Sequence, residues 1–156
     1  MALVDLLFSA KGRMNRAKYI LVTLLYFLAA ICGVMLAYFT MDSFTSTAGW
    51  IFVIVVYTPI GWSSVVIGIK RLHDRNKSGW WVLLFYLAPN ILDNAASSAE
   101  RYGNSTAGIV AEAVGLAITL WALVELMCLR GTIGPNRYGA DPVTRDISTG
   151  EATGHP

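Results

Sequence analysis

Charged side chains are scarce in this sequence, and their scarcity argues against an ordinary soluble domain. Asp, Glu, Lys and Arg make up 14% of the 156 residues, whereas hydrophobic residues make up 55%. Soluble globular domains carry about 25% charged residues, so these proportions indicate a protein that lies in a membrane. The formal net charge of +2 is too small to indicate a nucleic-acid partner.

Cysteine and histidine are also few. The two cysteines, Cys32 and Cys128, lie inside separate apolar runs, and the two histidines are His73 and His155. The topology predicted below places the cysteines roughly 20 Å apart in depth, at 1.5 Å per helical residue, which is too far for a disulfide. No group of Cys and His has the spacing of metal ligands, so we expect no metal and no cofactor.

The sequence also lacks any recognisable catalytic motif. The sequence has no Ser or Cys in the setting of a known nucleophile and no glycine-rich phosphate loop. His73 and Asp74 are adjacent, which allows an acid–base hypothesis for an enzyme that acts on a lipid, but neighbours in sequence point in different directions. We therefore expect a protein that is not an enzyme. Asp74 is predicted to accept hydrogen bonds from Arg13 or Arg16, and His73 to cap the second membrane span.

Long apolar runs are what the sequence does have. Segments of about 19–39, 49–69, 79–98 and 108–129 are predicted to cross the membrane, because about 20 helical residues span a ~30 Å hydrocarbon core. The third run is short, so it either continues past Pro89 with a kink or re-enters, and Pro59 is predicted to kink the second. The predicted fold is an all-α polytopic membrane protein, a four-transmembrane-helix bundle with a kinked short third helix. It forms one domain over residues 1–142, with a flexible cytoplasmic tail over residues 143–156.

The positions of Lys and Arg predict how the chain crosses the membrane. The segments outside the spans carry, in chain order, four, none, four, one and three of these cations. Because cytoplasmic segments are enriched in Lys and Arg, this alternation predicts a multi-pass protein with its N- and C-termini in the cytoplasm. A re-entrant third segment would leave the three arginines of the C-terminal segment outside, so a spanning third helix is favoured.

The spans contain two further features. Glu112 and Glu125 lie near opposite ends of the last span and on different faces, which favours a salt bridge from Glu125 to Arg71, Arg75 or Arg130 over a proton-coupled pair. Small residues recur every four positions on the first and last spans, a pattern that lets helices approach closely. It is interpreted as packing within the bundle, with a dimer interface as the alternative. These residues are Ala29, Gly33, Ala37, Ala107, Ala111, Gly115 and Thr119.

Three polar motifs lie at the predicted cytoplasmic ends of the spans. They are Gly12-Arg13-Met14-Asn15-Arg16 followed by Tyr19, then Arg71-Leu72-His73-Asp74 with Ser78-Gly79-Trp80-Trp81, and Gly134-Pro135-Asn136-Arg137-Tyr138-Gly139 with Asp141-Pro142. By these motifs the chain resembles the DUF805 family of small bacterial inner-membrane proteins of unknown function. It departs from the usual pattern at Ile20, Arg75-Asn76 and Ala140. The resemblance implies a polytopic protein of the bacterial inner membrane, and it implies no particular activity.

The topology predicts that the three motifs meet as one polar cap, in which Arg13, Arg16, Arg71 and Arg137 face Asp74, Asp141 and Glu125. Two interpretations stay open: a site that binds anionic lipid headgroups or a partner protein, or an ion network that only fixes the helices. The predicted function is a non-enzymatic accessory or scaffold subunit, in a larger membrane complex or a homo-oligomer. A small oligomeric transporter or channel is the alternative. The candidate site residues are Arg13, Arg16, Arg71, His73, Asp74, Asn136, Arg137, Tyr138 and Asp141.

Overall fold

The structure, a computed structural model, describes residues 3–39 and 47–143, and the described chain is helical. Its helices are α1 (Leu3–Phe8), α2 (Arg16–Phe39), α4 (Thr47–Asp74), α5 (Trp81–Arg101) and α6 (Ser105–Leu123), and α6 continues as the π-helix η1 (Val124–Cys128). Within the described ranges no strand forms, and Asn136 and Gly139 make one isolated bridge. The all-α prediction is therefore confirmed. All of the predicted tail except residue 143, that is residues 144–156, lies outside the described residues, as do residues 40–46 of the predicted first loop.

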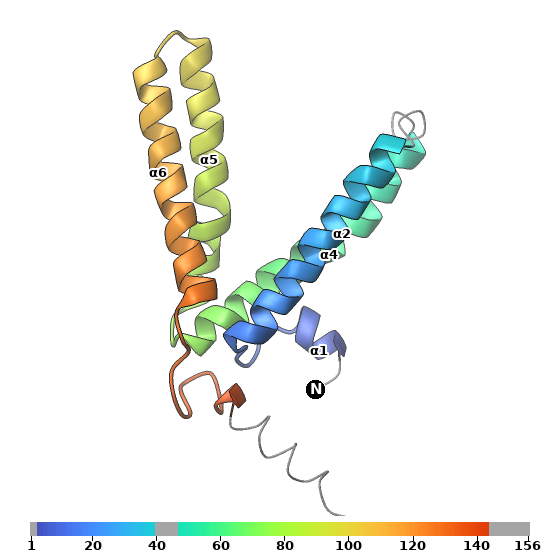
Figure 1. The fold of residues 1–156 in the computed structure, drawn as a ribbon, viewed down its shortest axis with the longest axis vertical. Coiled ribbons are helices and arrows are strands. Elements are labelled where there is room, and N and C mark those ends of the chain that lie inside the picture. Colours follow the sequence, from blue (N-terminus) through green and yellow to red (C-terminus); the bar gives the residue numbers. More distant parts are fainter. Residues whose placement is uncertain (1–2, 40–46, 144–156) are drawn as a thin grey trace, which may run out of the picture.

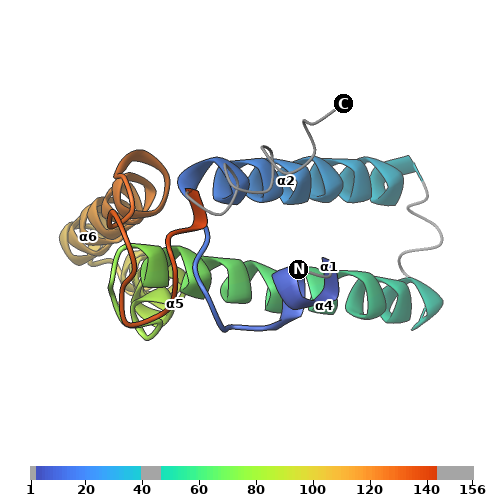
Figure 2. The same cartoon turned by 90° about the horizontal axis from the view of Figure 1, so that it is seen from below.

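The four long helices form two antiparallel hairpins that diverge like the arms of a V (Figure 1). One hairpin is α2 with α4 and the other is α5 with α6, and α1 lies against α4. Seen from below, α2 and α4 run side by side while the second hairpin points away from them (Figure 2). Between the hairpins, α4 packs on α5, and both α2 and α4 pack on η1. The bundle expected from the sequence is thus packed at one end only, because in lipid no hydrophobic force drives helices together along their whole length.

Three of the four predicted spans are long and apolar enough to cross a membrane: Arg16–Leu36, Val53–Asp74 and Ser105–Cys128. The prediction of four spans is not matched by α5, although α5 has 21 residues and continues through Pro89. The physical reason is the polar second half of this helix. Asn90, Asn94 and Ser98 donate to the backbone carbonyls four residues earlier, at 2.7, 2.7 and 2.8 Å, so these side chains are satisfied by their own helix.

The helices of each hairpin approach each other closely at small residues. A Cβ added at Gly33 of α2 would come 1.5 Å from the Tyr57 hydroxyl of α4. A Cβ at Gly115 of α6 would meet Leu92 of α5 at 3.5 Å, and one at Gly108 would meet Glu100 at 3.2 Å. At Gly33 and Gly115 the small-residue stripes serve packing within the chain, as the sequence predicted, and Gly108, which was not in the predicted stripes, packs in the same way.

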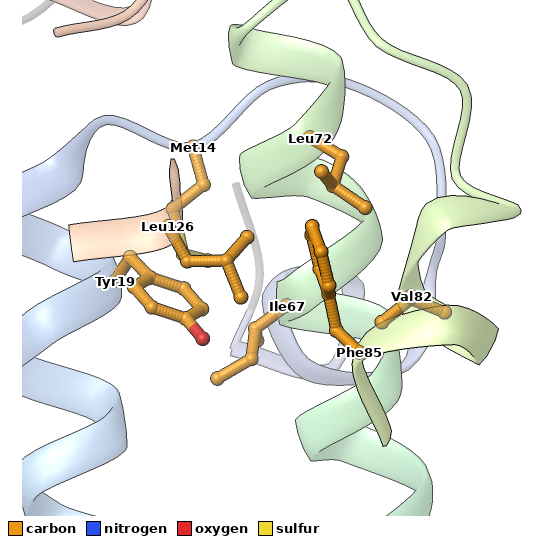
Figure 3. Close-up of a cluster of buried hydrophobic side chains, with 7 residues drawn as sticks. All are labelled: Met14, Tyr19, Ile67, Leu72, Val82, Phe85 and Leu126. Carbon is orange, nitrogen blue, oxygen red and sulfur yellow. The ribbon is translucent and has the colours of Figure 1, made fainter. Parts of the chain in front are cut away.

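The buried apolar core lies where the two hairpins meet (Figure 3). It is built from α2, α4, α5, η1 and the segment before α2, and its members are Met14, Tyr19, Ile67, Leu72, Val82, Phe85 and Leu126. Farther along α2, large apolar side chains such as Leu25, Phe27 and Val34 are exposed, as lipid-facing residues should be. The core therefore fixes the junction of the hairpins, and the polar motifs lie at this same junction.

Candidate functional site

The three sequence motifs come together at the junction of the hairpins and form the polar cap, defined here as residues 12–16, 70–79 and 125–141. Several of its charged side chains are buried. Lys70, Arg71, Asp74 and Glu125 all lie in the interior, and the Arg13 side chain is only 1% exposed. A buried charge is tolerated only when it is paired and hydrogen-bonded, so the partners of each charge decide what the cap can do.

Asp74, the last residue of α4, is the centre of the cap. Its carboxylate forms ion pairs with Arg13 Nη2 at 3.0 Å and with Arg71 Nη1 at 2.6 Å. Its backbone carbonyl accepts from the Thr132 N–H at 2.8 Å and the Thr132 hydroxyl at 3.0 Å. Of the two donors predicted for Asp74, Arg13 is thus the one found. One aspartate joins the N-terminal motif, the end of α4 and the chain that follows η1.

Arg13 and Arg71 use their remaining N–H groups on backbone carbonyls. Arg13 donates to the carbonyls of Thr132 and Gly134 at 2.5 and 2.6 Å. Arg71 donates through Nε to the Leu126 carbonyl at 2.7 Å and through Nη2 to the Leu129 carbonyl. Helix ends leave carbonyls without intrahelical donors, and here the two arginines satisfy carbonyls in η1 and the chain after it. Both predicted site residues are therefore internal cross-links of the fold.

Glu125 in η1 is neutralised by two cations of the turn between α4 and α5. Arg75 Nε lies 2.9 Å and Lys77 Nζ 3.0 Å from its Oε1. The predicted salt bridge between Glu125 and Arg75 is thus present. Lys77 also lies over the Trp81 and Trp121 rings, at 5.7 and 6.0 Å from their centroids, which adds a cation–π contact. Arg75 and Lys77 were not among the candidate site residues, although their place in the basic segment before Trp80 could have indicated them.

Lys70 is the other charged residue that sequence reasoning missed. Its side chain is fully buried, and its ammonium donates to the Asp5 carbonyl of α1 at 2.6 Å. In the sequence Lys70 reads as the first exposed cation after an apolar run. Its burial arises because α1 folds back over α4. No local sequence pattern predicts this contact.

The segment 132–141 completes the cap over the end of α4. Asn136 Nδ2 donates to the His73 carbonyl at 2.9 Å and the Thr132 hydroxyl at 2.8 Å. The Tyr138 ring stacks on His73 with centroids 3.8 Å apart. Arg137 donates to the Asn76 carbonyl at 3.0 Å. His73 lies in the last turn of α4, as predicted for a capping residue, but its Nδ1 lies 3.3 Å from the Gly12 carbonyl of another segment rather than against a carbonyl of its own helix.

Asp141 holds the end of this segment and should make it sensitive to acid. Its carboxylate accepts from the Val143 and Gly134 N–H groups, both at 2.9 Å, and these hydrogen bonds hold the pKa of Asp141 below its usual value. A lowered pKa stabilises the folded form above the unfolded pKa, and the stabilisation is lost as the pH falls through the folded pKa. We expect amide hydrogen exchange in segment 134–143, corrected for intrinsic rates, to accelerate below that pKa.

The Asp141→Asn variant should show the same faster exchange at neutral pH, because the neutral amide is a weaker acceptor. Asp93→Asn is the control, since Asp93 is an exposed carboxylate on α5, and it should leave segment 134–143 unchanged. Equal exchange in wild type and Asp141→Asn at neutral pH would mean that the carboxylate does not hold this segment.

Two exposed arginines remain beside a pocket at the start of α2. The pocket has a volume of about 280 Å³ and is lined by Asn15, Arg16, Ala17, Asp74, Arg130, Gly131, Thr132, Ile133, Asp141 and Val143. We call it the α2 pocket. The ion pairs found among the described residues involve Arg13, Arg71, Arg75 and Lys77, and Arg16 and Arg130 are not among them. Arg16 makes one long contact, 3.4 Å to the Cys128 carbonyl.

The first turn of α2 also opens toward this pocket. Asn15 precedes the helix and accepts from the Lys18 N–H at 2.9 Å, while Asn15, Arg16 and Ala17 line the pocket. The first N–H groups of a helix have no intrahelical acceptor, and the helix dipole is positive there. The α2 pocket therefore combines two guanidinium groups with the positive end of a helix of 24 residues.

Comparison with known proteins identifies relatives over nearly the whole chain. The sequence model of the family described as "Protein of unknown function (DUF805)" matches residues 7–140. The chain is 29% identical to "Uncharacterized protein YiiR" of Escherichia coli (strain K12), over 94% of this chain and 93% of that protein. It is 25% identical to "Inner membrane protein YhaI" of the same strain, over 84% of this chain and 83% of that protein. No solved structure matches the chain.

Proposed function

Because this chain belongs to the DUF805 family of membrane proteins, whose description names no activity, we propose a function from the geometry of its polar cap. The protein is a non-enzymatic scaffold of the bacterial inner membrane, and its α2 pocket binds the headgroup of an anionic lipid. The name of the relative YhaI supports the inner membrane. The distribution of Lys and Arg supports a multi-pass chain with its termini and polar cap in the cytoplasm.

One observation carries this proposal: Arg16 and Arg130 line the α2 pocket, and neither is in an ion pair found among the described residues, although Arg130 lies near enough to Asp141 to help lower its pKa. The two acids of the same pocket are already engaged. Asp74 is paired with Arg13 and Arg71, and Asp141 accepts two backbone N–H groups. Arg16 and Arg130 are therefore the cations that remain for a phosphate, and a guanidinium binds phosphate oxygens in a bidentate manner.

The surroundings of the α2 pocket suit a lipid better than a free anion. The apolar run of α2 begins at Tyr19, so the pocket lies at the depth of the headgroups if α2 spans the membrane. Next to the phosphate position, Ile133 is 78% exposed and Val143 is 45% exposed. Along α2, Ile20 and Leu21 are also exposed. These apolar side chains could contact the glycerol and the first methylenes of the acyl chains.

A scaffold is favoured over an enzyme because the adjacent His73 and Asp74 serve different neighbours. Asp74 is held by two arginines, whereas His73 Nδ1 faces the Gly12 carbonyl and its ring stacks on Tyr138. An acid–base pair needs a common substrate within hydrogen-bond reach of both groups. The two ion pairs of Asp74 support a structural role for this residue.

Removal of both pocket arginines should weaken binding of anionic lipid. A cation near an anionic headgroup contributes about 1 kcal/mol, so Arg16→Ala with Arg130→Ala should raise the Kd for phosphatidylglycerol roughly 30-fold. Native mass spectrometry in mild detergent would measure this value for wild type and variant. Phosphatidylethanolamine, whose ammonium group offsets the charge of its phosphate, should lose much less affinity than phosphatidylglycerol in the double variant.

The matched control removes two cations from the same end of the molecule, in Lys11→Ala with Arg137→Ala. Both side chains are exposed and neither lines the α2 pocket. This control should keep phosphatidylglycerol binding within about threefold of wild type, as expected for a screened effect of general charge. Equal losses in the two double variants, or unchanged binding after removal of Arg16 and Arg130 from a folded protein, would overturn the proposal.

A further inference from the structure

A second pocket lies between α4 and α5, on the side of the junction where Tyr138 covers His73. Its volume is about 380 Å³, within the range of about 300–1,000 Å³ that is typical of small-molecule sites. We call it the α4–α5 pocket. It shares no lining residue with the α2 pocket, so nothing argued below depends on the anion site.

The pocket is apolar toward the membrane and polar toward the cap. Its apolar side is formed by Val65 and Ile69 of α4 and by Val82 and Leu83 of α5. Its polar side is formed by His73, Ser78 and Tyr138, and Trp80, which is 78% exposed, lies at its edge. A long apolar wall that ends in a few polar groups is the arrangement that binds an amphipathic molecule.

Two glycines bring the walls together and leave the polar corner open. A Cβ at Gly68 would lie 3.0 Å from Val82 Cγ2, so α4 and α5 approach closely there. A Cβ at Gly79 would lie 2.8 Å from Ile69 Cγ2 and 3.5 Å from His73 Nε2. A side chain at position 79 would therefore occupy the space in front of the imidazole.

The orientation of His73 determines which hydrogen-bonding group the pocket presents. Its Nδ1 lies 3.3 Å from the Gly12 carbonyl, and a carbonyl can only accept, so Nδ1 carries the proton in this contact. In a neutral imidazole the other nitrogen is then an acceptor. Nε2 lies on the side of Gly79, which lines the pocket. The Tyr138 ring, stacked at 3.8 Å and 6°, fixes the plane in which this lone pair points.

The charges around the pocket determine what kind of donor it can take. No Asp, Glu, Lys or Arg is among its lining residues. An ammonium group would have no carboxylate to pair with, and a phosphate would have no cation. Arg137 lies 4.7 Å from the Tyr138 ring, which further disfavours a cationic ligand, but its guanidinium donates to the Asn76 carbonyl and is not part of the pocket lining. An uncharged hydroxyl group can donate to Nε2 without either penalty.

We propose that the α4–α5 pocket binds a neutral lipid of the diacylglycerol class. Its free hydroxyl donates to His73 Nε2, its ester region lies near Ser78, and its acyl chains follow Val65, Ile69, Val82 and Leu83 into the membrane. The hydroxyl distinguishes this lipid from the phospholipids around it, in which the same position is esterified. The pocket thus selects a lipid by a hydrogen-bond donor, whereas the α2 pocket selects by charge.

Dioctanoylglycerol and its methyl ether provide a test that needs no variant. The two molecules share both acyl chains, but the ether has no hydroxyl proton to donate. Native mass spectrometry of the wild-type protein in mild detergent should show that dioctanoylglycerol binds about tenfold more tightly than the ether, the effect of one hydrogen bond. Equal binding of the two lipids, or binding of neither, would overturn the proposal.

His73→Phe assigns the preference to the imidazole. Phenylalanine keeps a ring that can stack on Tyr138 but has no acceptor nitrogen. The variant should bind dioctanoylglycerol and the ether equally, both about as weakly as wild type binds the ether, with its Tm measured alongside to confirm folding. Persistence of the tenfold preference in folded His73→Phe would place the hydroxyl elsewhere and overturn the assignment.

Discussion

Arg71→Ala is expected to destabilise the folded protein more than the loss of any other cation of the polar cap. The Arg71 side chain is 0% exposed and pairs with Asp74 at 2.6 Å. Its other bonds hold the carbonyls of Leu126 and Leu129 at the end of η1. Alanine would leave Asp74 with Arg13 alone and those two carbonyls without this donor. Removal of one partner from a buried ion pair costs about 3–5 kcal/mol, which is a large part of the stability of a small domain.

This loss would be measured as a lower temperature of thermal unfolding in detergent. Size-exclusion chromatography after heating would report the fraction of protein that stays monodisperse. The unfolding temperature of Arg71→Lys should lie between those of wild type and Arg71→Ala. An ammonium keeps the charge but cannot donate to Asp74, Leu126 and Leu129 with the geometry of a guanidinium. Arg137→Ala is the control, since its exposed guanidinium donates to the single carbonyl of Asn76, and its loss should cost less than about 1 kcal/mol. If Arg71→Ala unfolds at the same temperature as Arg137→Ala, Arg71 does not hold the junction.

The helices themselves could be predicted closely, because each depends on a continuous run of sequence. The predicted spans of 19–39 and 49–69 lie inside α2 and α4, and the prediction of 108–129 covers most of α6 and η1. The α5 helix shows where this reasoning stops. Its length could be predicted from residues 79–98, but its asparagines and serines place it below the apolar content of the other three. The divergence of the two hairpins could not be predicted either. The sequence of an apolar helix face is similar whether the face contacts lipid or another helix.

The polar cap could be predicted as a meeting of three motifs but not as a set of hydrogen bonds. Charge complementarity placed Arg13 among the predicted partners of Asp74, and Arg75 among those of Glu125. Opposite charges at one membrane surface have few other partners. The bonds from Arg13 and Arg71 to backbone carbonyls carry no such signal, since every residue has a carbonyl. This difference matters for function. Arg13 and Arg71 therefore belong to the framework rather than to the candidate ligand site, and Arg16 and Arg130 are the cations of the α2 pocket that lie outside these ion pairs.

Gly131→Ala should have the second large effect, because position 131 lies against the clamped carboxylate. A Cβ there would lie 1.9 Å from Asp74 Oδ2 and 2.5 Å from its Cγ. Arg13 and Arg71 hold this carboxylate from both sides, so the chain after η1 has to shift and the two Thr132 bonds to the Asp74 carbonyl are weakened. Overpacking costs about 1–3 kcal/mol and each hydrogen bond about 1 kcal/mol. We therefore expect a loss of roughly 3 kcal/mol, measured as the shift in thermal unfolding.

Gly61→Ala separates this steric effect from the general effect of replacing glycine. A Cβ at Gly61 meets nothing within 4 Å and the position is inside α4, so alanine should leave the protein as stable as wild type or up to about 1 kcal/mol more stable. The sharper comparison places Gly131→Ala in an Asp74→Ala background. If the clash with the carboxylate is the cause, the second substitution should cost much less there than in wild type, because side chains in contact are not additive. Equal costs in the two backgrounds would mean that residue 131 strains the backbone for a reason unrelated to Asp74, and that the segment after η1 is positioned without it.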